Sequence, residues 1–276
     1  MPELPEVETI RSGLERALCA GTRIKSVELR RADIRFPIPK NLPARLKDQK
    51  LKGIRRRAKY ILFDFENVTL LSHLGMTGGW RIECDSRKII LGAHDHCLIH
   101  LYDGRTLIYR DPRRFGILDL IVPDKEEQHP RLKELGVEPL DAEAFHAQFL
   151  FQASRRRSVA IKAFIMDQKV VVGIGNIYAS EALFSAQIRP TKPAGRLTQA
   201  EAKSLVQASR EVLKAAILAG GSTIRDYTSA SGEKGGFQDQ HLVYERAGQA
   251  CRDCNTAIKS KVISGRSTYW CPTCQK

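Results

Sequence analysis

No stretch of apolar residues in the 276-residue chain approaches the roughly 20 residues that a helix needs to cross a bilayer. The first twenty residues do not resemble a signal peptide, because four acidic residues and two prolines interrupt them. Internal repeats are absent as well. Since 42% of the residues are hydrophobic, the chain is globular rather than disordered, and its length predicts about two domains. We expect a cytoplasmic protein, and nothing in the sequence demands an oligomer, so a monomer is expected.

Acidic residues are scarce relative to basic ones. The chain has 31 Asp and Glu against 45 Lys and Arg, which gives a net charge of +14 and a pI of about 9.6. Such an excess repels itself unless an anionic partner is bound. Nucleic acid and an anionic membrane surface are the two candidates. The sequence has neither a strongly basic amphipathic helix nor a lipidation motif, which favours nucleic acid.

Cysteine is limited to seven residues, and four of them form two CxxC pairs separated by sixteen residues. In a cytosolic chain this spacing predicts one structural Zn²⁺ rather than disulfides or redox thiols. The ligands are Cys251, Cys254, Cys271 and Cys274. The segment between the pairs is strand-like around SGRS, so a hairpin would carry Arg266 near its tip, either solvated or presented to a phosphate. We expect Cys19, Cys84 and Cys97 to be small buried hydrophobes.

The pattern along the chain changes from strand to helix. After a helix that starts near Pro5, residues 22–122 are rich in strands, with a hairpin signal at Asp103-Gly104. These strands are too apolar for a sheet that exposes one face to solvent, which predicts a sandwich or a closed barrel. Residues 123–140 are charged and contain three prolines, as a linker does. Residues 141 to about 220 have helical patterns, and Thr198 with Glu201 predicts a capping box.

The fold class expected from this order is α+β with two domains. The predicted boundaries are 1–122 for a β-sandwich with its N-terminal helix, 123–140 for the linker, 141–240 for the helical domain and 241–276 for the zinc ribbon. A polar, glycine-rich stretch at about 222–238 within the helical domain has the length of a lid or a disordered loop.

Several short segments are candidates for contacting an anionic ligand, although each also has a plain structural interpretation. Lys59 follows a basic run and alternates with apolar residues of a strand, so it points into a cleft or to solvent. DPRRFG at 111–116 places two arginines and Phe115 in a turn, which suits base stacking and phosphate contact, or else Phe115 is buried beneath surface arginines. Met76, in HLGM, is near a turn or in the core. VVGIGN places free backbone amides and Asn176 before a helix, as an anion site or an ordinary cap.

The opening MPELPEVET raises a chemical possibility. If Met1 is removed, Pro2 becomes the N-terminus, and its secondary amine has a pKa far below that of a lysine. Such an amine attacks the anomeric carbon of a sugar and yields a charged iminium, which is a good electron sink for elimination. Glu3 stands beside it and is able to move protons during ring opening. The alternative is that these residues merely lead into the helix.

The chain contains a set of motifs that occur together in one known family: MPELPEVET, RRAKYIL, HLGM, HDH at 94–96, DPRRFG, VVGIGNIYASEALF and the two CxxC pairs. In their order, and over nearly the whole chain, the sequence resembles bacterial formamidopyrimidine-DNA glycosylase. The related endonuclease VIII branch more usually begins PEGPEI, so PELPEV favours the branch that acts on oxidised purines.

The resemblance implies a fold and a reaction. A β-sandwich with an N-terminal helix is joined to a helical domain with a helix–two-turn–helix motif and a zinc ribbon. The reaction removes 8-oxoguanine or formamidopyrimidines from duplex DNA and cuts the strand by β- and δ-elimination. By motif match, Pro2 is the Schiff-base nucleophile and Glu3 the acid. Glu6 orients the lesion or the opened sugar, Lys59 serves β-elimination, and Arg266 serves δ-elimination.

The resemblance also implies DNA contacts. Met76, Arg113 and Phe115 match the trio that fills the gap left by a flipped base, with Arg113 facing the orphaned cytosine. Three further residues match phosphate contacts: His94, Arg157 and Asn176. The family often has lysines where this chain reads SRRRS at 154–158, so the charge is kept. The alternatives are a glycosylase for oxidised pyrimidines and a non-catalytic zinc-ribbon DNA-binding protein.

Overall fold

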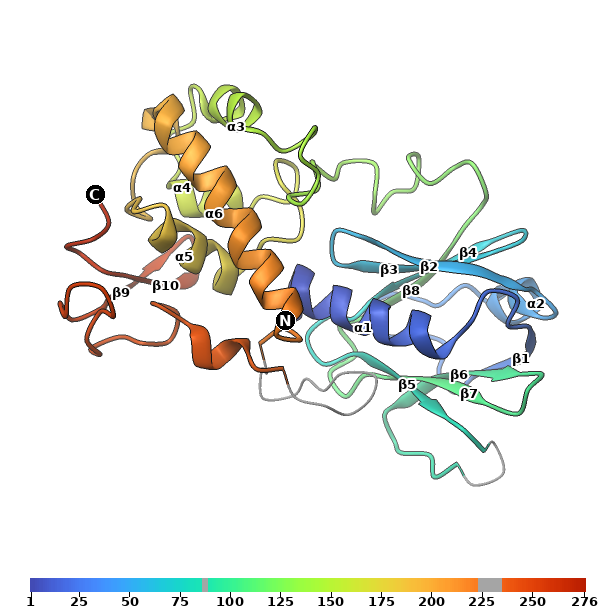
Figure 1. Cartoon of the computed structure of the whole chain (residues 1–276). Helices are drawn as coiled ribbons and strands as arrows, with labels where there is room; N and C mark the ends of the chain where they lie inside the picture. Colours follow the sequence, from blue (N-terminus) through green and yellow to red (C-terminus); the bar gives the residue numbers. More distant parts are fainter. Residues whose placement is uncertain (86–88, 223–234) are drawn as a thin grey trace. The chain divides into compact units, whose positions relative to one another are not determined.

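The computed structural model describes residues 1–85, 89–222 and 235–276, and it divides into two compact units (Figure 1). The first unit comprises Met1–Lys133 and Gly220–Gly235, and the second comprises Glu134–Ala219 and Gly236–Lys276. The division after residue 133 falls within the predicted linker. The zinc ribbon shares one unit with the helical segment. Most of the predicted lid, residues 223–234, lies outside the described residues.

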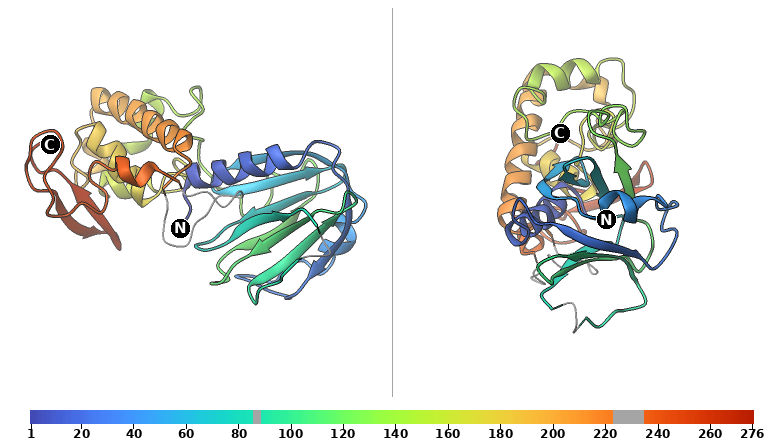
Figure 2. Two further views of the ribbon diagram at one scale, coloured as in Figure 1. Left: turned by 60° about the horizontal axis from the view of Figure 1, so that its bottom comes forward. Right: turned by 90° about the vertical axis from the view of Figure 1, so that its right-hand side faces the viewer.

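The first unit is a two-layered β-sandwich with one long helix, as predicted (Figure 2). Its strands form two antiparallel four-stranded sheets, in the orders β1-β6-β7-β5 and β2-β3-β4-β8. The bounds of the first sheet are β1 (Ile24–Leu29), β6 (Asp95–Leu101), β7 (Thr106–Arg110) and β5 (Gly79–Glu83). Those of the second sheet are β2 (Leu51–Arg57), β3 (Tyr60–Phe65), β4 (Thr69–His73) and β8 (Ile117–Ile121). The helices of this unit are α1 (Leu4–Ala17) and α2 (Leu42–Leu46).

The core of the first unit lies between the sheets and under α1. Val7, Ile10 and Leu14 recur at helical spacing and are all buried in a cluster that includes side chains from both sheets. Trp80 lies in the same cluster and donates its indole N–H to Ser72 Oγ at 2.9 Å. Burial of this apolar stripe holds α1 in place along the sandwich, and with it the first residues of the chain.

The hairpin predicted at Asp103-Gly104 joins β6 to β7. Leu101 N–H donates to Arg105 O at 2.9 Å, and Gly104 has a φ of +91°, so the turn needs a residue without a Cβ at that position. The tighter link between β2 and β3 is formed by Ala58 and Lys59 alone, and Ala58 has a φ of +54°. This hairpin therefore places Lys59 at a fixed end of the second sheet.

The second unit contains the helices and the ribbon hairpin. Its helices are α3 (Ala147–Ser154), α4 (Ile161–Ile165), α5 (Asn176–Ser185) and α6 (Gln199–Leu218), with 3₁₀ turns η2 (Ala194–Arg196) and η3 (Phe237–Gln240). The predicted capping box begins α6: Thr198 N–H donates to Glu201 Oε2 at 2.9 Å, and Glu201 N–H to Thr198 Oγ1 at 3.2 Å. Gly220 and Gly221, with φ of +75° and +80°, follow the end of this helix.

The ribbon hairpin consists of β9 (Lys259–Ile263) and β10 (Arg266–Trp270). Ser264 and Gly265 form its two-residue turn, and both have positive φ, +49° and +73°, as a type I′ turn requires. Arg266 therefore directly follows the turn, as the sequence predicts for a residue near the tip.

The expectation for the unpaired cysteines is wrong for two of the three. Cys97 is buried in β6, but Cys19 and Cys84 are exposed, because they follow the ends of α1 and β5 instead of lying within them. Across the described ranges, the structure has no helix whose length and apolar character would let it cross a membrane.

Candidate active site and metal centre

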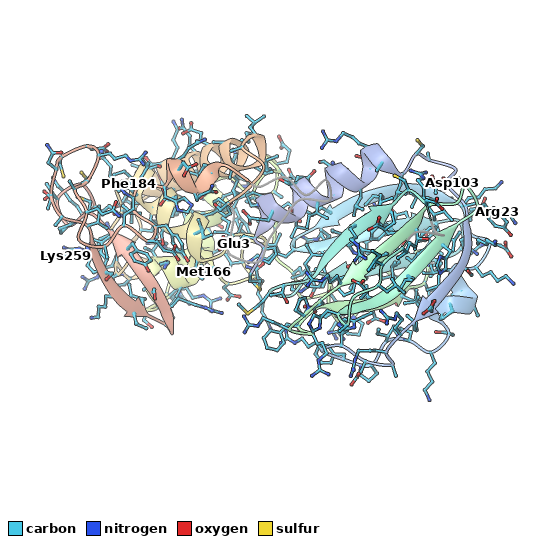
Figure 3. The ribbon with its side chains drawn as sticks, turned by 90° about the horizontal axis from the view of Figure 1, so that it is seen from below. Glu3, Arg23, Asp103, Met166, Phe184 and Lys259 are labelled. Carbon is cyan, nitrogen blue, oxygen red and sulfur yellow. The ribbon has the colours of Figure 1, made fainter. Side chains whose placement is uncertain are left out.

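The first residues of the chain are fixed by two carboxylates. Pro2 and Glu3 are buried, and Glu3 is the N-cap of α1 in an extended conformation, with φ −99° and ψ −171°. Glu6 completes a capping box by accepting the Glu3 N–H at 2.8 Å on Oε2. Its other oxygen, Oε1, accepts the Ser222 N–H at 2.8 Å. Glu6 thus holds the start of α1 and the segment beside it, and Figure 3 shows Glu3 at one end of this unit, with Arg23 and Asp103 at the other.

Charged groups of both signs act on the N-terminal ammonium, which is that of Met1, next to Pro2. Burial lowers its pKa below the usual 8.0; Glu3 and Glu6 raise it, and Lys59 and Arg113 lower it further. Four predicted site residues therefore act electrostatically on the amine that precedes Pro2, the fifth. An amine in such surroundings is deprotonated more easily, and a deprotonated amine is a nucleophile.

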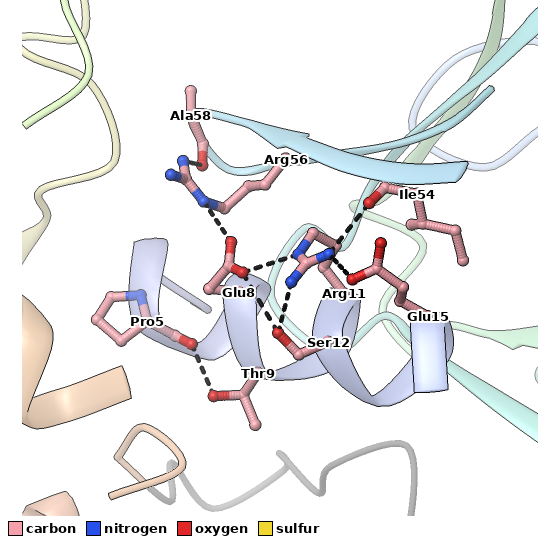
Figure 4. Close-up of polar contacts among 9 residues, drawn as sticks. All are labelled: Pro5, Glu8, Thr9, Arg11, Ser12, Glu15, Ile54, Arg56 and Ala58. Atoms are coloured by element: carbon pink, nitrogen blue, oxygen red, sulfur yellow. Dashed lines mark hydrogen bonds and ion pairs between the residues drawn. The ribbon is translucent and has the colours of Figure 1, made fainter. Parts of the chain in front are cut away.

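The hairpin that carries Lys59 is attached to α1 by a polar network (Figure 4). Glu8 accepts from Arg56 Nε at 3.0 Å and from Arg11 Nε at 2.7 Å. Arg56 also donates to Ala58 O at 2.9 Å, and Arg11 donates to Ile54 O at 3.1 Å. Since Lys59 follows Ala58 directly, this network sets the position of the lysine relative to the helix.

Lys59 is only 7% exposed, and it lies close enough to His73 to affect its titration. Burial lowers the pKa of His73 to about 4, and the cations of Lys59, Arg35 and Arg131 act in the same direction. His73 Nδ1 accepts the Gly75 N–H at 3.0 Å, as a neutral imidazole can. Sequence reasoning missed His73 as a site residue, although it opens the HLGM motif.

The predicted base-replacing residues are exposed on two neighbouring loops. Met76 is 38% exposed and Phe115 is 41% exposed, so neither belongs to the core. The Arg113 guanidinium lies 4.9 Å from the centre of the Phe115 ring. His94 is exposed just before β6, and its carbonyl accepts the Asp111 N–H at 3.0 Å.

In the second unit, Asn176 is the first residue of α5 and is bound on both sides of its amide. Its Oδ1 accepts from Lys162 Nζ at 2.6 Å, and its Nδ2 donates to Ser267 O at 2.9 Å. Lys162 is buried and also donates to Thr268 Oγ1 at 2.8 Å. This lysine, which sequence reasoning missed, ties the start of α5 to the strand that begins with Arg266. Gly175, and not Asn176, is the N-cap of the helix.

The remaining two predicted cations are exposed. Arg157 follows α3, and its backbone is held by a bond from Gly195 N–H to Arg157 O at 2.7 Å. Arg266 is exposed at the start of β10.

The four paired cysteines form the metal centre. Their Sγ atoms all lie within 4.8 Å of one another, with 3.9 Å between Cys251 and Cys274 and 3.4 Å between Cys254 and Cys271. Tetrahedral zinc with Zn–S bonds of about 2.3 Å would separate its sulfurs by about 3.8 Å. The set therefore fits one structural Zn²⁺, as predicted. Four thiolates fill the coordination shell, so the ion stabilises the ribbon and takes no substrate.

A buried carboxylate joins the ribbon to the helices. Glu181, on α5, accepts the N–H groups of Leu242, Val243 and Tyr244 at 2.8, 3.1 and 2.7 Å. Burial raises the pKa of Glu181, whereas these three bonds lower it. No spacing in the sequence indicates this contact, because its partners are backbone amides some sixty residues away.

Three family models match the chain. The formamidopyrimidine-DNA glycosylase N-terminal domain matches residues 1–118, the H2TH domain of the same enzymes matches 135–228, and the zinc finger found in FPG and IleRS matches 248–276.

Individual relatives cover the same length. The chain is 48% identical over 276 residues to the formamidopyrimidine-DNA glycosylase of Bdellovibrio bacteriovorus, with all of both chains covered. A mutant Lactococcus lactis FPG in complex with Fapy-dG-containing DNA is 34% identical, with a TM-score of 0.91 and full coverage of both chains. The wild-type Lactococcus lactis protein bound to DNA with an oxidized pyrimidine is also 34% identical, with a TM-score of 0.89 and full coverage of both.

Proposed function

The chain belongs to the formamidopyrimidine-DNA glycosylase family, whose members are glycosylases with AP lyase activity, and we propose that it excises oxidised purines from duplex DNA. The observation that carries this proposal is that Glu3, Glu6, Lys59 and Arg113 all act on the Met1 amine, directly beside the nitrogen of Pro2. A fixed, partly desolvated amine beside a carboxylic acid and a lysine suits base removal through a Schiff base.

In the first step, the nucleophile is Pro2 after removal of Met1. Its nitrogen lone pair forms a bond to C1′ of the damaged nucleotide, the glycosidic bond breaks with its electron pair leaving on the purine, and the N–H proton released from the nitrogen passes to the purine. The Glu3 acid then gives a proton to O4′ as the C1′–O4′ bond breaks, and the nitrogen becomes an iminium. Because Glu3 is the N-cap of α1, its backbone is fixed close to the amine.

In the second step, the iminium accepts electrons. Loss of a proton from C2′ expels the 3′-phosphate, and loss of a second proton from C4′ expels the 5′-phosphate. We assign the first elimination to Lys59, which is nearly buried at its hairpin, and the second to Arg266 by its motif position. Glu6, whose carboxylate holds Glu3 and Ser222, orients the opened sugar or the lesion.

DNA binding follows from the charge and from the exposed residues. Flipping a base out of the duplex costs a few kcal/mol, which side chains inserted in its place offset. Met76, Arg113 and Phe115 are exposed together and suit that role, with Arg113 facing the unpaired cytosine. The proposed phosphate contacts are His94, Arg157 and Asn176. A net charge of +14 makes the affinity strongly dependent on salt.

Oxidised pyrimidines are the second candidate substrate class. The observation that favours them is the Lactococcus lactis complex, in which a protein of this family is bound to DNA with an oxidized pyrimidine. The PELPEV start favours purines. Because its relatives are bacterial, we place the chain in the cytoplasm, associated with the nucleoid through DNA binding, and acting as a monomer.

A cleavage panel tests the proposal. Purified protein is incubated with duplexes that contain 8-oxoguanine, a formamidopyrimidine, thymine glycol or an abasic site, and base release and strand products are measured separately. We expect rapid excision of the two purine lesions, slower excision of thymine glycol, and products that carry phosphate at both ends of the gap. Faster release of thymine glycol would favour the second candidate, and binding without any cleavage would favour a non-catalytic DNA-binding protein.

A further inference from the structure

The two loops that carry the exposed residues, 74–78 and 111–116, are packed backbone against backbone. Gly75 has a φ of +63°, and a Cβ at this position would lie 2.4 Å from the carbonyl carbon of Phe115. A Cβ at Gly116 would lie 1.7 Å from the Tyr109 hydroxyl and 2.9 Å from His73 O. Because a side chain at either glycine would clash with neighbouring atoms, the close packing of the two loops requires both glycines.

Asp111 is the polar centre of this pair of loops. Its side chain is fully buried; Oδ1 accepts from the Thr77 hydroxyl at 2.7 Å, and Oδ2 accepts the Gly116 N–H at 2.8 Å. Its carbonyl oxygen is bound by His96 Nε2 at 2.8 Å. A buried carboxylate is costly unless its oxygens are bound, so the fold depends on these donors.

Thr77 connects the loops through both functions of its hydroxyl group. The group donates to Asp111 Oδ1 at 2.7 Å and accepts the Arg113 N–H at 3.1 Å. Thr77 is also the direct neighbour of Met76 in the chain. One hydroxyl thus fixes the backbone of Arg113 and the end of the loop that presents Met76.

We propose that Thr77 is a positioning residue that sets the selectivity of the enzyme for the base opposite the lesion. The inference rests on the proposed function, in which Arg113 faces the orphaned base. An arginine reads a base edge through hydrogen bonds whose geometry tolerates little displacement. If Arg113 is held less firmly, it discriminates less between cytosine and adenine, and the reaction with cytosine slows because the flipped state is less well stabilised.

Threonine variants separate this role from a general loss of structure. Thr77→Val keeps the shape and removes the hydroxyl, whereas Thr77→Ser keeps the hydroxyl. Thr77→Ala leaves room for a water molecule at Asp111 and serves as a second variant if valine prevents folding. Thr69→Val is the matched control: Thr69 donates to Asp64 Oδ1 at 2.9 Å at the far end of β4, five residues before the loop.

The measurements are single-turnover excision of 8-oxoguanine opposite cytosine and opposite adenine, and the Kd for undamaged duplex DNA. For Thr77→Val or Thr77→Ala we expect the rate opposite cytosine to fall about tenfold, equivalent to about 1.4 kcal/mol in the barrier. The cytosine-to-adenine ratio should fall with it, and the Kd should change less than about twofold. Thr77→Ser should restore the ratio, and Thr69→Val should leave it unchanged.

The outcomes distinguish this inference from the proposed function. An unchanged cytosine-to-adenine ratio in Thr77→Val and Thr77→Ala, with wild-type protein excising normally, would overturn the role of Thr77 alone. An equal loss in Thr69→Val would show that only stability had changed, which also overturns it. If wild-type protein excises no lesion, the proposed function itself fails.

Discussion

The partly buried His73 predicts that the first unit loses stability in mild acid. Its pKa falls from 6.5 in the unfolded chain to about 4 in the folded chain, so the unfolded chain binds this proton first as the pH drops. The stabilisation is therefore complete above pH 6.5 and is lost as the pH falls toward 4. The full shift corresponds to about 3 kcal/mol. About 2 kcal/mol of it disappears between about pH 7 and about pH 5.

The chain provides a reporter for this measurement. Trp80 lies in the core of the first unit, and Trp270 lies in the ribbon. In a Trp270→Phe background, Trp80 fluorescence follows urea unfolding of the first unit. The comparison is with His73→Asn, whose amide oxygen still accepts the Gly75 N–H but does not titrate in this range.

The quantity of interest is the difference in unfolding free energy between the two proteins at each pH. It isolates His73 from other groups, among them His241, whose pKa burial also lowers to about 4. We expect this difference to shrink by about 2 kcal/mol between about pH 7 and about pH 5. A difference that does not vary with pH would refute the assignment of a partly buried, neutral imidazole beside Lys59.

Three further predictions concern other parts of the molecule. Glu8→Gln should lower the unfolding free energy by about 1–2 kcal/mol and slow the cleavage of abasic DNA, because it weakens the ion pair to Arg56 that positions the Lys59 hairpin. Thermal melts measure the stability and gel assays the cleavage rate, and a variant with wild-type stability and rate would contradict the prediction. Phe115→Ala should slow lesion excision about tenfold with little change in affinity for undamaged duplex, and equal losses in both would argue against insertion. Cys254→Ser should lose zinc, change Trp270 fluorescence and weaken DNA binding together; a variant without zinc that binds DNA normally would contradict a role for the ribbon.

Features with a local cause could be predicted from the sequence. The stripe of Val7, Ile10 and Leu14, the capping box at Thr198 and the CxxC spacing each depend on residues close together in the chain. The turn at DPRRFG could be predicted from Asp-Pro, whereas the sequence leaves open whether Phe115 is exposed or buried, and the structure shows it exposed. The 3.6-residue period of a helix, the chemistry of helix caps and the geometry of metal ligands are sufficient to predict these elements.

What could not be predicted depends on contacts between distant segments. The lowered pKa of His73 depends on its partial burial and on Lys59, Arg35 and Arg131, two of which are distant in the chain, and no local pattern indicates it. The anchoring of the ribbon by Glu181 uses backbone amides, which have no sequence signature. Nothing in the sequence distinguishes Lys162 from the other basic residues, yet in the structure it is buried and bonded to Asn176. Long-range polar contacts of this kind require the fold itself.

The central claim is that the amine of Pro2 forms the covalent bond to the deoxyribose. The direct test is to trap the intermediate with borohydride on 8-oxoguanine DNA, digest the adduct with protease and nuclease, and locate the modification by mass spectrometry. We predict a single modified peptide that begins at Pro2, with no adduct from a Pro2→Gly variant that folds normally. An adduct on Lys59, or full activity of protein that retains Met1, would contradict the claim.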